Sequence, residues 1–314
     1  MSQNIFIGKK MNEWLEEASN LPPIVPLYEP WWNEGEVCFF FGSSGIGKTL
    51  FAIHMAKHIS QERKILYFDF ELSQRQIFNR YKKEDQPLPF PDNFLRFELQ
   101  QGNSASGNEV IREIENKINQ HDASIVIIDN LTWILEDGQE AKKAIPFMKK
   151  ILTLRNKYNA SILIIGHTPK RMQTTNISRS GELTTYSNPI TIFDMAGSMA
   201  LQNFIDSSFA IVQSRKDDSL RYFKQIKARN SEIIHGDANV AVYRLEHDSQ
   251  GYLGFTFIEY SPEVIHLRSQ PLTEREQLIS EIHRLHSQGL SNREIGRIVG
   301  LSHPTVARYL ENQS

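Results

Sequence analysis

The feature that most constrains this chain is a glycine-rich stretch that separates an apolar run from a helical pattern. The stretch reads Gly42, Ser43, Ser44, Gly45, Ile46, Gly47, Lys48 and Thr49. Residues 37–41 before it predict a buried strand, and residues 50–56 after it have helical spacing. Glycines let such a loop wrap a polyphosphate, whose charge is attracted by the free amide groups at the start of the helix. The stretch therefore predicts a nucleoside triphosphate site, and a structural glycine-rich turn is the alternative.

Two residues at the end of this loop carry its chemistry. Lys48 is expected to neutralise the β- and γ-phosphates, and the Thr49 hydroxyl is expected to bind Mg²⁺. Leu50 closes the segment that we expect to contact the nucleotide. The expected cofactors are therefore ATP and Mg²⁺.

The composition is that of an ordinary globular protein. The 314 residues suffice for one large domain and a small one. No apolar stretch approaches the length of a membrane span, and the N-terminus lacks a signal-peptide pattern, so we expect a cytoplasmic protein. The single cysteine, Cys38, excludes an internal disulfide. A net charge of −2 gives no global basic field, so any DNA binding must come from local patches.

Strands and helices alternate along the first half of the chain. Strands are predicted at 37–41, 64–70, 95–99, 124–128 and 160–165, with helices at 73–83, 108–120 and 141–158. Continuous apolar strands between helices are typical of an α/β fold with a mostly parallel sheet that is covered on both faces. Ligands of such sheets bind at the carboxyl ends of the strands. Later strands are predicted at 204–213, 222–228, 240–246 and 254–260, partly antiparallel.

We expect four regions along the chain. An N-terminal extension covers residues 1–35, an ATPase domain covers 36–262, a linker covers 263–271 and a small all-α domain covers 272–314. Between the strands predicted at 160–165 and 204–213, residues 170–198 are polar and without clear periodicity. Loops of that length are usually functional or disordered.

Acidic residues follow two of the predicted strands. Asp129 follows the strand 124–128, where an aspartate orients Mg²⁺ directly or through water. Glu71 follows the strand 64–70, where a carboxylate activates or positions an attacking water, and Asp69 competes for that role. The alternative for Glu71 is a helix-start acid that favours the helix dipole.

These motifs resemble, in their order, those of RecA-like P-loop ATPases of the DnaB-like branch. The segment from Phe68 to Ser73 is similar to the strand-end glutamate motif of that branch, which implies that Glu71 is the catalytic base. His167 ends a strand where RecA-like ATPases carry a polar sensor, which implies a link from the γ-phosphate to the following loop. A histidine that caps a buried strand is the alternative.

A basic segment, Lys227-Ala228-Arg229-Asn230, extends the resemblance. It is similar to the Lys-x-Arg-Asn segment by which hexameric DnaB-like helicases and ring ATPases of the KaiC type reach a neighbouring subunit's nucleotide. The resemblance implies that Lys227 and Arg229 act in trans and that the protein is a homo-oligomer, a hexameric ring. A planar guanidinium suits the charge that develops on a transferred phosphate. Taken alone, the segment is a basic turn.

The resemblance covers roughly residues 30–260 and has two departures. The chain lacks the large N-terminal helical domain of replicative DnaB helicases, and it lacks the zinc-binding cysteines of RadA-like repair ATPases. It is more similar to compact replicative helicases of the RepA kind from plasmids or mobile elements. A non-helicase ATPase of the same branch is also compatible with these motifs.

Residues 170–198 occupy the place of the DNA-binding loops in this fold. Lys170, Arg171 and Arg179 lie there among threonine, serine, asparagine and glycine. Such residues suit contacts to the phosphates of single-stranded DNA without reading of bases. A lid without a ligand is the alternative.

The C-terminal segment strongly resembles a helix-turn-helix of the resolvase or transcription-regulator type. Three helices are predicted, the first ending at residue 286 and the others at 292–299 and 303–310, with Ser291 and Ser302 as N-caps. The resemblance implies that the last helix reads duplex DNA, with four exposed candidates, His303, Thr305, Arg308 and Tyr309. Acidic and basic residues nearly balance there, so a protein-interaction role is the alternative.

Two hypotheses of function follow. The first is an oligomeric ATP-hydrolysing motor on DNA, a helicase or translocase that acts in replication. The second is a regulatory or switch ATPase, in which nucleotide-dependent assembly controls binding of DNA or a partner through the C-terminal helices.

Overall fold

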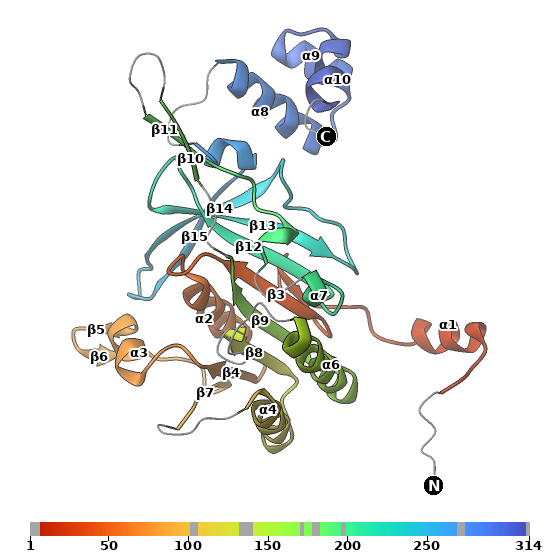
Figure 1. Ribbon diagram of the computed structural model, residues 1–314, viewed down its shortest axis with the longest axis vertical. Helices are drawn as coiled ribbons and strands as arrows, with labels where there is room; N and C mark the ends of the chain where they lie inside the picture. The colour runs from red at the N-terminus through yellow and green to blue at the C-terminus, as the bar shows by residue number, and fades with distance from the viewer. Residues whose placement is uncertain are drawn as a thin grey trace.

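The computed structural model describes residues 7–100, 106–131, 141–169, 173–177, 183–195, 199–268 and 274–311. Six neighbouring strands of its main sheet run parallel: β3 (Val37–Gly42), β4 (Ile65–Asp69), β7 (Phe94–Glu98), β8 (Ile125–Asp129), β9 (Ser161–His167) and β12 (Ser207–Gln213). Three antiparallel strands extend it: β13 (Leu220–Ala228), β14 (Val240–His247) and β15 (Leu253–Ser261). Within the described residues the order is β15-β14-β13-β12-β3-β9-β8-β4-β7 (Figure 1). The predicted α/β fold with a mostly parallel sheet is confirmed.

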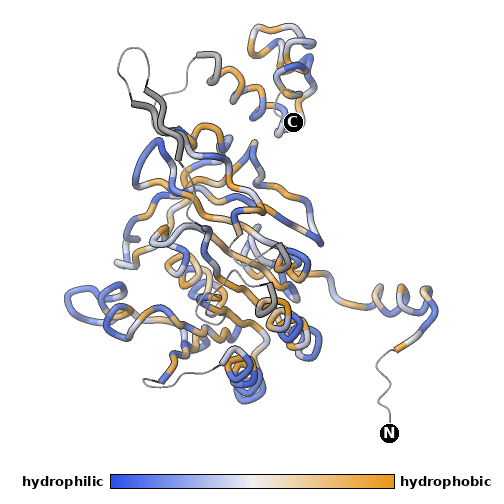
Figure 2. The backbone as a smooth tube through the Cα atoms, in the orientation of Figure 1, coloured by the Kyte–Doolittle hydropathy of each residue, from blue (hydrophilic) through white to orange (hydrophobic). Residues whose placement is uncertain are grey.

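Helices cover both faces of this sheet. Alternate side chains of each strand point to opposite faces, so apolar strands give each face a core to be covered. Phe40 of β3 belongs to the core under α2 (Lys48–Ile59), and it stacks on Phe209 with ring centroids 4.4 Å apart. Phe39 and Phe41 belong to the core under α4 (Gly107–His121) and α6 (Ala141–Tyr158). Burial of each such ring contributes about 1.5–3 kcal/mol. Figure 2 shows apolar segments concentrated in the central strands.

Short elements surround the sheet and differ from the prediction in places. At the N-terminal end lie α1 (Met11–Ser19), β1 (Pro26–Tyr28) and β2 (Trp32–Asn33); after β4 lie α3 (Gln74–Arg80), β5 (Lys82–Lys83) and β6 (Gln86–Pro87). The helix predicted over 73–83 ends at Arg80, because the next residue, Tyr81, turns into the core and is 5% exposed. The strand predicted from 204 starts at Ser207, after the short helix α7 (Met199–Gln202).

A hairpin lies in the region that was expected to be irregular. Strands β10 (Gln173–Ile177) and β11 (Leu183–Ser187) pair antiparallel, from Gln173 opposite Ser187 to Ile177 opposite Leu183. The threonines, isoleucine and tyrosine of these segments favour a pleated strand, and the expectation of no regular structure is wrong for them. Two 3₁₀ turns, η1 (Ile192–Asp194) and η2 (Glu263–His266), follow later in the chain.

The C-terminal residues form three helices: α8 (Glu274–Ser287), α9 (Asn292–Val299) and α10 (His303–Glu311). They enclose a small core of Ile282, Leu285, Ile295 and Val306. The predicted N-cap of α9 is confirmed, since the Ser291 hydroxyl accepts from the amide of Glu294 while the Glu294 carboxylate accepts from the Ser291 amide. The predicted small all-α domain is therefore also present.

Candidate active site

The glycine-rich stretch connects β3 to α2, and its backbone requires glycine at two positions. Gly47 has a φ of 111°, and a Cβ atom there would stand 3.0 Å from Cζ of Phe255. A Cβ atom at Gly42 would stand 2.5 Å from the carbonyl oxygen of Ile211 on β12. Residues 43–45 are exposed. The loop is therefore packed too closely for side chains at its ends, and its middle remains open to a phosphate at the start of α2.

Lys48 is the first residue of α2 and lies across the loop. Its Nζ donates to the carbonyl oxygens of Gly42, at 3.0 Å, and of Ser43, at 2.8 Å. The same Nζ lies 3.0 Å from Nδ1 of His167. Burial lowers the pKa of Lys48 to about 8, although two nearby carboxylates oppose this shift. The structure therefore brings Lys48 and His167, two of the candidate site residues, into contact.

Asp129 ends β8 and is fully buried. Its Oδ2 accepts a hydrogen bond of 2.7 Å from the Tyr67 hydroxyl, and its Oδ1 has no hydrogen-bond partner among the described residues. Burial raises the pKa of Asp129 to about 7, and the hydroxyls of Thr49 and Tyr67 oppose that rise. A buried carboxylate oxygen near a threonine hydroxyl offers the oxygen ligands that Mg²⁺ prefers. Both predicted metal ligands, Thr49 and Asp129, therefore fit this ion.

Asp69 and Glu71 differ in what their carboxylates do. Asp69 is buried, and its Oδ1 accepts from the backbone amides of Glu71 and Leu72, both at 2.9 Å. Its Oδ2 accepts from Nε of Arg96 at 2.9 Å. Glu71 is exposed, and its Oε2 accepts from Nδ2 of Asn130 at 3.0 Å. Asp69 thus fixes the backbone of the strand end, and only Glu71 presents its carboxylate to an incoming group.

Asn130 joins the two sides of the site, and the sequence reasoning missed it. Its Nδ2 contacts Glu71 and also lies 3.2 Å from Nε2 of His167. The pKa of His167 is lowered by burial and by the charge of Lys48, while Glu71 opposes the shift. A continuous polar path therefore runs from Glu71 through Asn130 and His167 to Lys48. The signal for Asn130 was its place directly after Asp129, at a strand end on the ligand-binding edge.

Lys227 and Arg229 lie far from this path. Arg229 follows β13, and its Nη1 contacts Oδ1 of Asp206 at 3.3 Å. Asp206 also accepts from the amide of Val37, the first residue of β3, whereas the phosphate loop follows the last residue of that strand. At 3.3 Å per residue, the six residues of β3 separate the two ends by about 16 Å. One copy of the chain therefore does not bring Arg229 to its own phosphate loop.

The two basic residues of that segment also differ in availability. Nζ of Lys227 donates to the carbonyl oxygens of Gln202 and Ile205, at 2.5 and 2.8 Å. The Arg229 side chain is 53% exposed. Lys227 therefore holds the turn before β12, whereas Arg229 pairs with Asp206 through Nη1 and leaves about half of its side chain exposed.

The predicted DNA-contacting residues have different outcomes. Lys170, Arg171 and Arg179 lie outside the described residues. In α10, His303 and Arg308 are exposed, as expected of groove-facing residues. The other two α10 candidates need correction.

Thr305 and Tyr309 are half-buried, whereas the sequence predicted that both are exposed. Thr305 is half-buried and its hydroxyl lies 2.8 Å from that of Ser302. Tyr309 is half-buried and packs on the small core of the three helices, because it follows Val306 by three residues on the same helix face. His303 and Arg308 therefore remain as the exposed candidates.

Exposed arginines on α9 extend this surface, and sequence reasoning missed them. Arg293 and Arg297 are exposed and four residues apart, on one face of the helix. In the sequence, the near balance of acidic and basic residues in this segment gave no sign of a basic surface. The Glu294 carboxylate is held by its cap, and Glu281 pairs with Arg284 at 2.5 Å.

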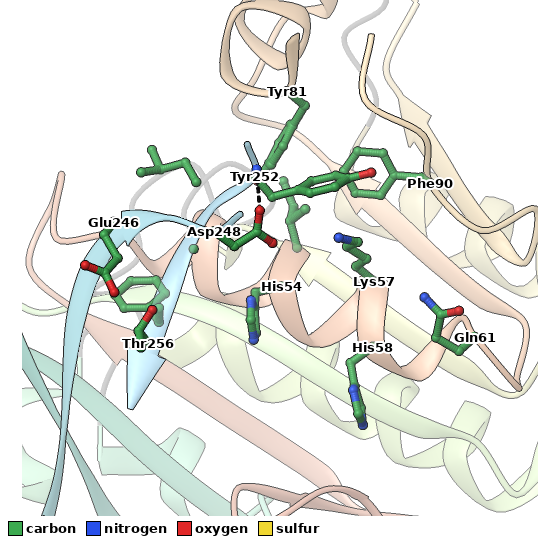
Figure 3. Close-up of a pocket in the computed structure, with 14 residues that line it drawn as sticks. His54, Lys57, His58, Gln61, Tyr81, Phe90, Glu246, Asp248, Tyr252 and Thr256 are labelled. Atoms are coloured by element: carbon green, nitrogen blue, oxygen red, sulfur yellow. Dashed lines mark hydrogen bonds between the residues drawn. The ribbon is translucent and has the colours of Figure 1, made fainter. Parts of the chain in front are cut away.

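A separate pocket lies between α2 and the turn from β14 to β15 (Figure 3). His54, Lys57 and His58 line it from the helix. Nζ of Lys57 lies 3.1 Å from the ring centroid of Tyr252, and the Tyr252 amide donates to Oδ1 of Asp248 at 2.9 Å. None of the predicted site residues lines this pocket. Phe255, which lines this pocket, also lies against Gly47 of the phosphate loop.

Comparison with known families supports the sequence motifs. A family model described as an AAA domain matches residues 10–173, just over half of the chain, and one described as a helix-turn-helix domain matches residues 275–312. No curated protein matches the chain. No helix in the described ranges has the length and apolar character needed to cross a membrane, and the same ranges hold no cluster of three or more potential metal ligands from His, Cys, Asp and Glu. The chain therefore belongs to the AAA domain family of P-loop ATPases and carries a C-terminal helix-turn-helix domain.

Proposed function

We propose that this protein is an oligomeric ATP-hydrolysing motor on DNA, a helicase of the DnaB or RepA kind that acts in replication of a plasmid or mobile element. The observation that carries the proposal is the position of Arg229. Its exposed guanidinium lies at the opposite end of β3 from the phosphate loop of its own chain. In a head-to-tail ring, such as a hexamer, the same residue would face the phosphate loop of the next copy.

Each copy supplies one half of the proposed hydrolytic site. Lys48 leaves its carbonyl partners to bind the β- and γ-phosphates, and Glu71 accepts a proton from the attacking water. Thr49 and Asp129 would hold Mg²⁺, which supplies charge to neutralise the phosphates when it is bound. Arg229 of the next copy stabilises the charge that develops on the γ-phosphate.

His167 connects this chemistry to the hairpin. It contacts Lys48 and Asn130 on one side, and the next residue, Thr168, donates its amide to the carbonyl oxygen of Gly42 at 3.0 Å. The chain then continues towards β10, whose flanking residues include the basic candidates Lys170 and Arg171. Loss of the γ-phosphate would therefore change contacts at the start of the segment proposed to hold single-stranded DNA.

The experiment is a measurement of ATP hydrolysis by the purified protein with and without single-stranded DNA, together with strand displacement on a forked duplex. We expect DNA to stimulate hydrolysis and the protein to separate the strands. Hydrolysis that does not respond to DNA, with no displacement, would exclude a motor. Assembly with an ATP analogue, with and without single-stranded DNA, tests the ring in the same preparation.

A second function, a switch ATPase that controls DNA binding, is favoured by the exposed arginines of the C-terminal helices. Arg293, Arg297 and Arg308 suit duplex phosphates, and their binding to DNA needs no translocation. Neutralising Lys170, Arg171 and Arg179 distinguishes the two functions. A motor loses its activity and a switch retains duplex binding, whereas removal of residues 272–314 has the reverse effect.

A further inference from the structure

One buried ion pair lies between the residues that follow β11 of the hairpin and the segment that leads to the C-terminal helices. Lys224 of β13 is 5% exposed, and Glu263, the first residue of η2, is 2% exposed. Nζ of Lys224 lies 2.6 Å from Oε2 of Glu263. Asp237 also contacts this lysine from a largely exposed position. Neither member of the pair is among the residues proposed for hydrolysis.

Both members of the pair hold the backbone of Ile190, three residues after β11. The amide of Ile190 donates to Oε1 of Glu263 at 2.9 Å, and its carbonyl oxygen accepts from Nζ of Lys224 at 2.8 Å. The hydroxyl of Tyr222 donates to the same Oε1 at 3.0 Å. The two charged groups are therefore fixed by hydrogen bonds on both sides, and both backbone groups of Ile190 depend on them.

A second set of bonds joins the same two segments nearer the C-terminal helices. The amide of Ser187, the last residue of β11, donates to the carbonyl oxygen of Leu267 at 2.9 Å. Arg215 bridges them as well, since its amide donates to the carbonyl oxygen of His266 at 2.8 Å and its Nε donates to the Ser187 hydroxyl at 3.0 Å. Residues 187–190 and 263–267 are thus held together along their length.

A buried ion pair contributes little net stability compared with apolar side chains of similar volume, but removal of one partner is strongly destabilising. The Lys224–Glu263 pair is therefore better explained by the geometry that it imposes on Ile190. A displacement of residues 263–267 must displace residues 187–190, because separating them would leave buried charges and backbone groups unpaired.

We propose that the Lys224–Glu263 pair transmits occupancy of the C-terminal helix-turn-helix to the β10–β11 hairpin. Binding of duplex DNA by α9 and α10 pulls on the chain that follows Leu267, and the pair passes this displacement to Ser187 and Ile190. The protein would thereby coordinate its duplex-binding and single-strand-binding parts. This coupling rests on the proposed function, since it requires that both parts bind DNA.

The test is hydrogen–deuterium exchange of the amides of residues 183–190 in the full chain, with and without a random-sequence duplex. A mobility shift on the same duplex checks that it is bound. In the unmodified protein, we expect duplex binding to change exchange at Ser187 and Ile190 by about fivefold or more. In Glu263→Gln, the amide nitrogen of the new side chain faces the lysine, and the response of the hairpin should disappear while ATP hydrolysis without DNA stays unchanged.

Two further variants keep the test decisive if Glu263→Gln does not fold. The double variant Lys224→Met/Glu263→Leu removes both charges and keeps apolar volume, so it should fold, as thermal melting would verify, and still lose the response. Tyr222→Phe removes one hydrogen bond and should retain a reduced response. Unchanged exchange in duplex-bound unmodified protein, or a full response in the folded double variant, would overturn the coupling. Absence of DNA-stimulated hydrolysis in the unmodified protein would overturn the proposed function instead.

Discussion

The hydroxyl of Tyr67 donates a 2.7 Å hydrogen bond to Oδ2 of Asp129, and both side chains are fully buried. The bond joins neighbouring strands, β4 and β8, two residues before the end of the first and at the end of the second. It fixes the carboxylate so that Oδ1, which has no partner among the described residues, remains for a cation. Tyr67 is therefore a positioning residue for the proposed Mg²⁺ ligand.

Replacement of Tyr67 by phenylalanine should weaken Mg²⁺ binding. The ring still fills the core, but Oδ2 of Asp129 loses its donor, and loss of such an outer partner lowers metal affinity about 10- to 100-fold. The measurement is the Mg²⁺ dependence of binding of a fluorescent ATP analogue. Tyr81→Phe is the matched control, because the Tyr81 hydroxyl is buried without a hydrogen-bond partner in the described part of the chain. Equal Mg²⁺ affinities for the two variants would contradict the role of Tyr67.

Asn130 should matter for turnover and little for ATP binding. In Asn130→Ala, the Glu71 carboxylate loses its 3.0 Å donor and His167 loses its contact to the same amide. Misplacement of a catalytic group by about 1 Å costs as much as 100-fold in rate. We expect kcat to fall at least tenfold with the Kd for an ATP analogue retained. Asn119→Ala, at an exposed position of α4, is the control, and a kcat equal to that of the control would refute the polar path.

The sequence predicted the sheet and one half of the site because both depend on local patterns. Apolar runs such as residues 125–128 define buried strands, and the glycine spacing around Lys48 defines the loop. The bond from Tyr67 to Asp129 depends instead on the register between strands, in which Asp69 stands opposite Asp129. Register is set by tertiary packing of the whole sheet, and no local pattern in one sequence reports it.

The hairpin and the Lys224–Glu263 ion pair were missed for a related reason. Lys224 looks like a surface lysine in sequence, since lysine is almost never fully buried without a partner. Its partner, Glu263, lies 39 residues away in a segment predicted to be a linker. Burial of the pair becomes visible only when β13 and η2 are placed together.

Arg229 should act across subunits. Arg229→Ala is expected to reduce ATP turnover by about 10³-fold or more, as removal of an arginine finger does, while ATP still binds at Lys48. Mixed with Lys48→Ala protein, it should recover turnover, because sites between the two variants combine an intact phosphate loop with an intact arginine. The measurement is steady-state hydrolysis at varied mixing ratios. Turnover no higher than the sum of the separate variants would argue against action in trans.

Stability should fall as the pH is lowered through the range in which buried histidines titrate. His266 is 1% exposed, and burial together with the charge of Lys216 lowers its pKa to about 4. In the unfolded chain it binds a proton near pH 6.5, so unfolding takes up a proton between these values. The contribution is fully present above pH 6.5 and is lost towards pH 4, by about 3 kcal/mol.

The check is the free energy of unfolding, measured by denaturant titration at pH 7 and at pH 5. His266→Gln keeps a polar side chain and has no titration, so its stability should depend less on pH. His303→Gln, at an exposed position of α10, is the matched control. A pH dependence in His266→Gln as steep as in the control would contradict the assignment.

The arginines of α9 should contribute to duplex binding more than a paired arginine does. Arg293 and Arg297 are exposed, whereas Arg284 is held by two bonds to Glu281. Each phosphate contact that is lost lowers the slope of log affinity against log salt by about one. Arg297→Ala should therefore weaken duplex binding and reduce this slope, and Arg284→Ala should leave both nearly unchanged. The measurement is the affinity for one duplex at several salt concentrations. If these helices bind a protein instead of DNA, neither variant should change the affinity or the slope.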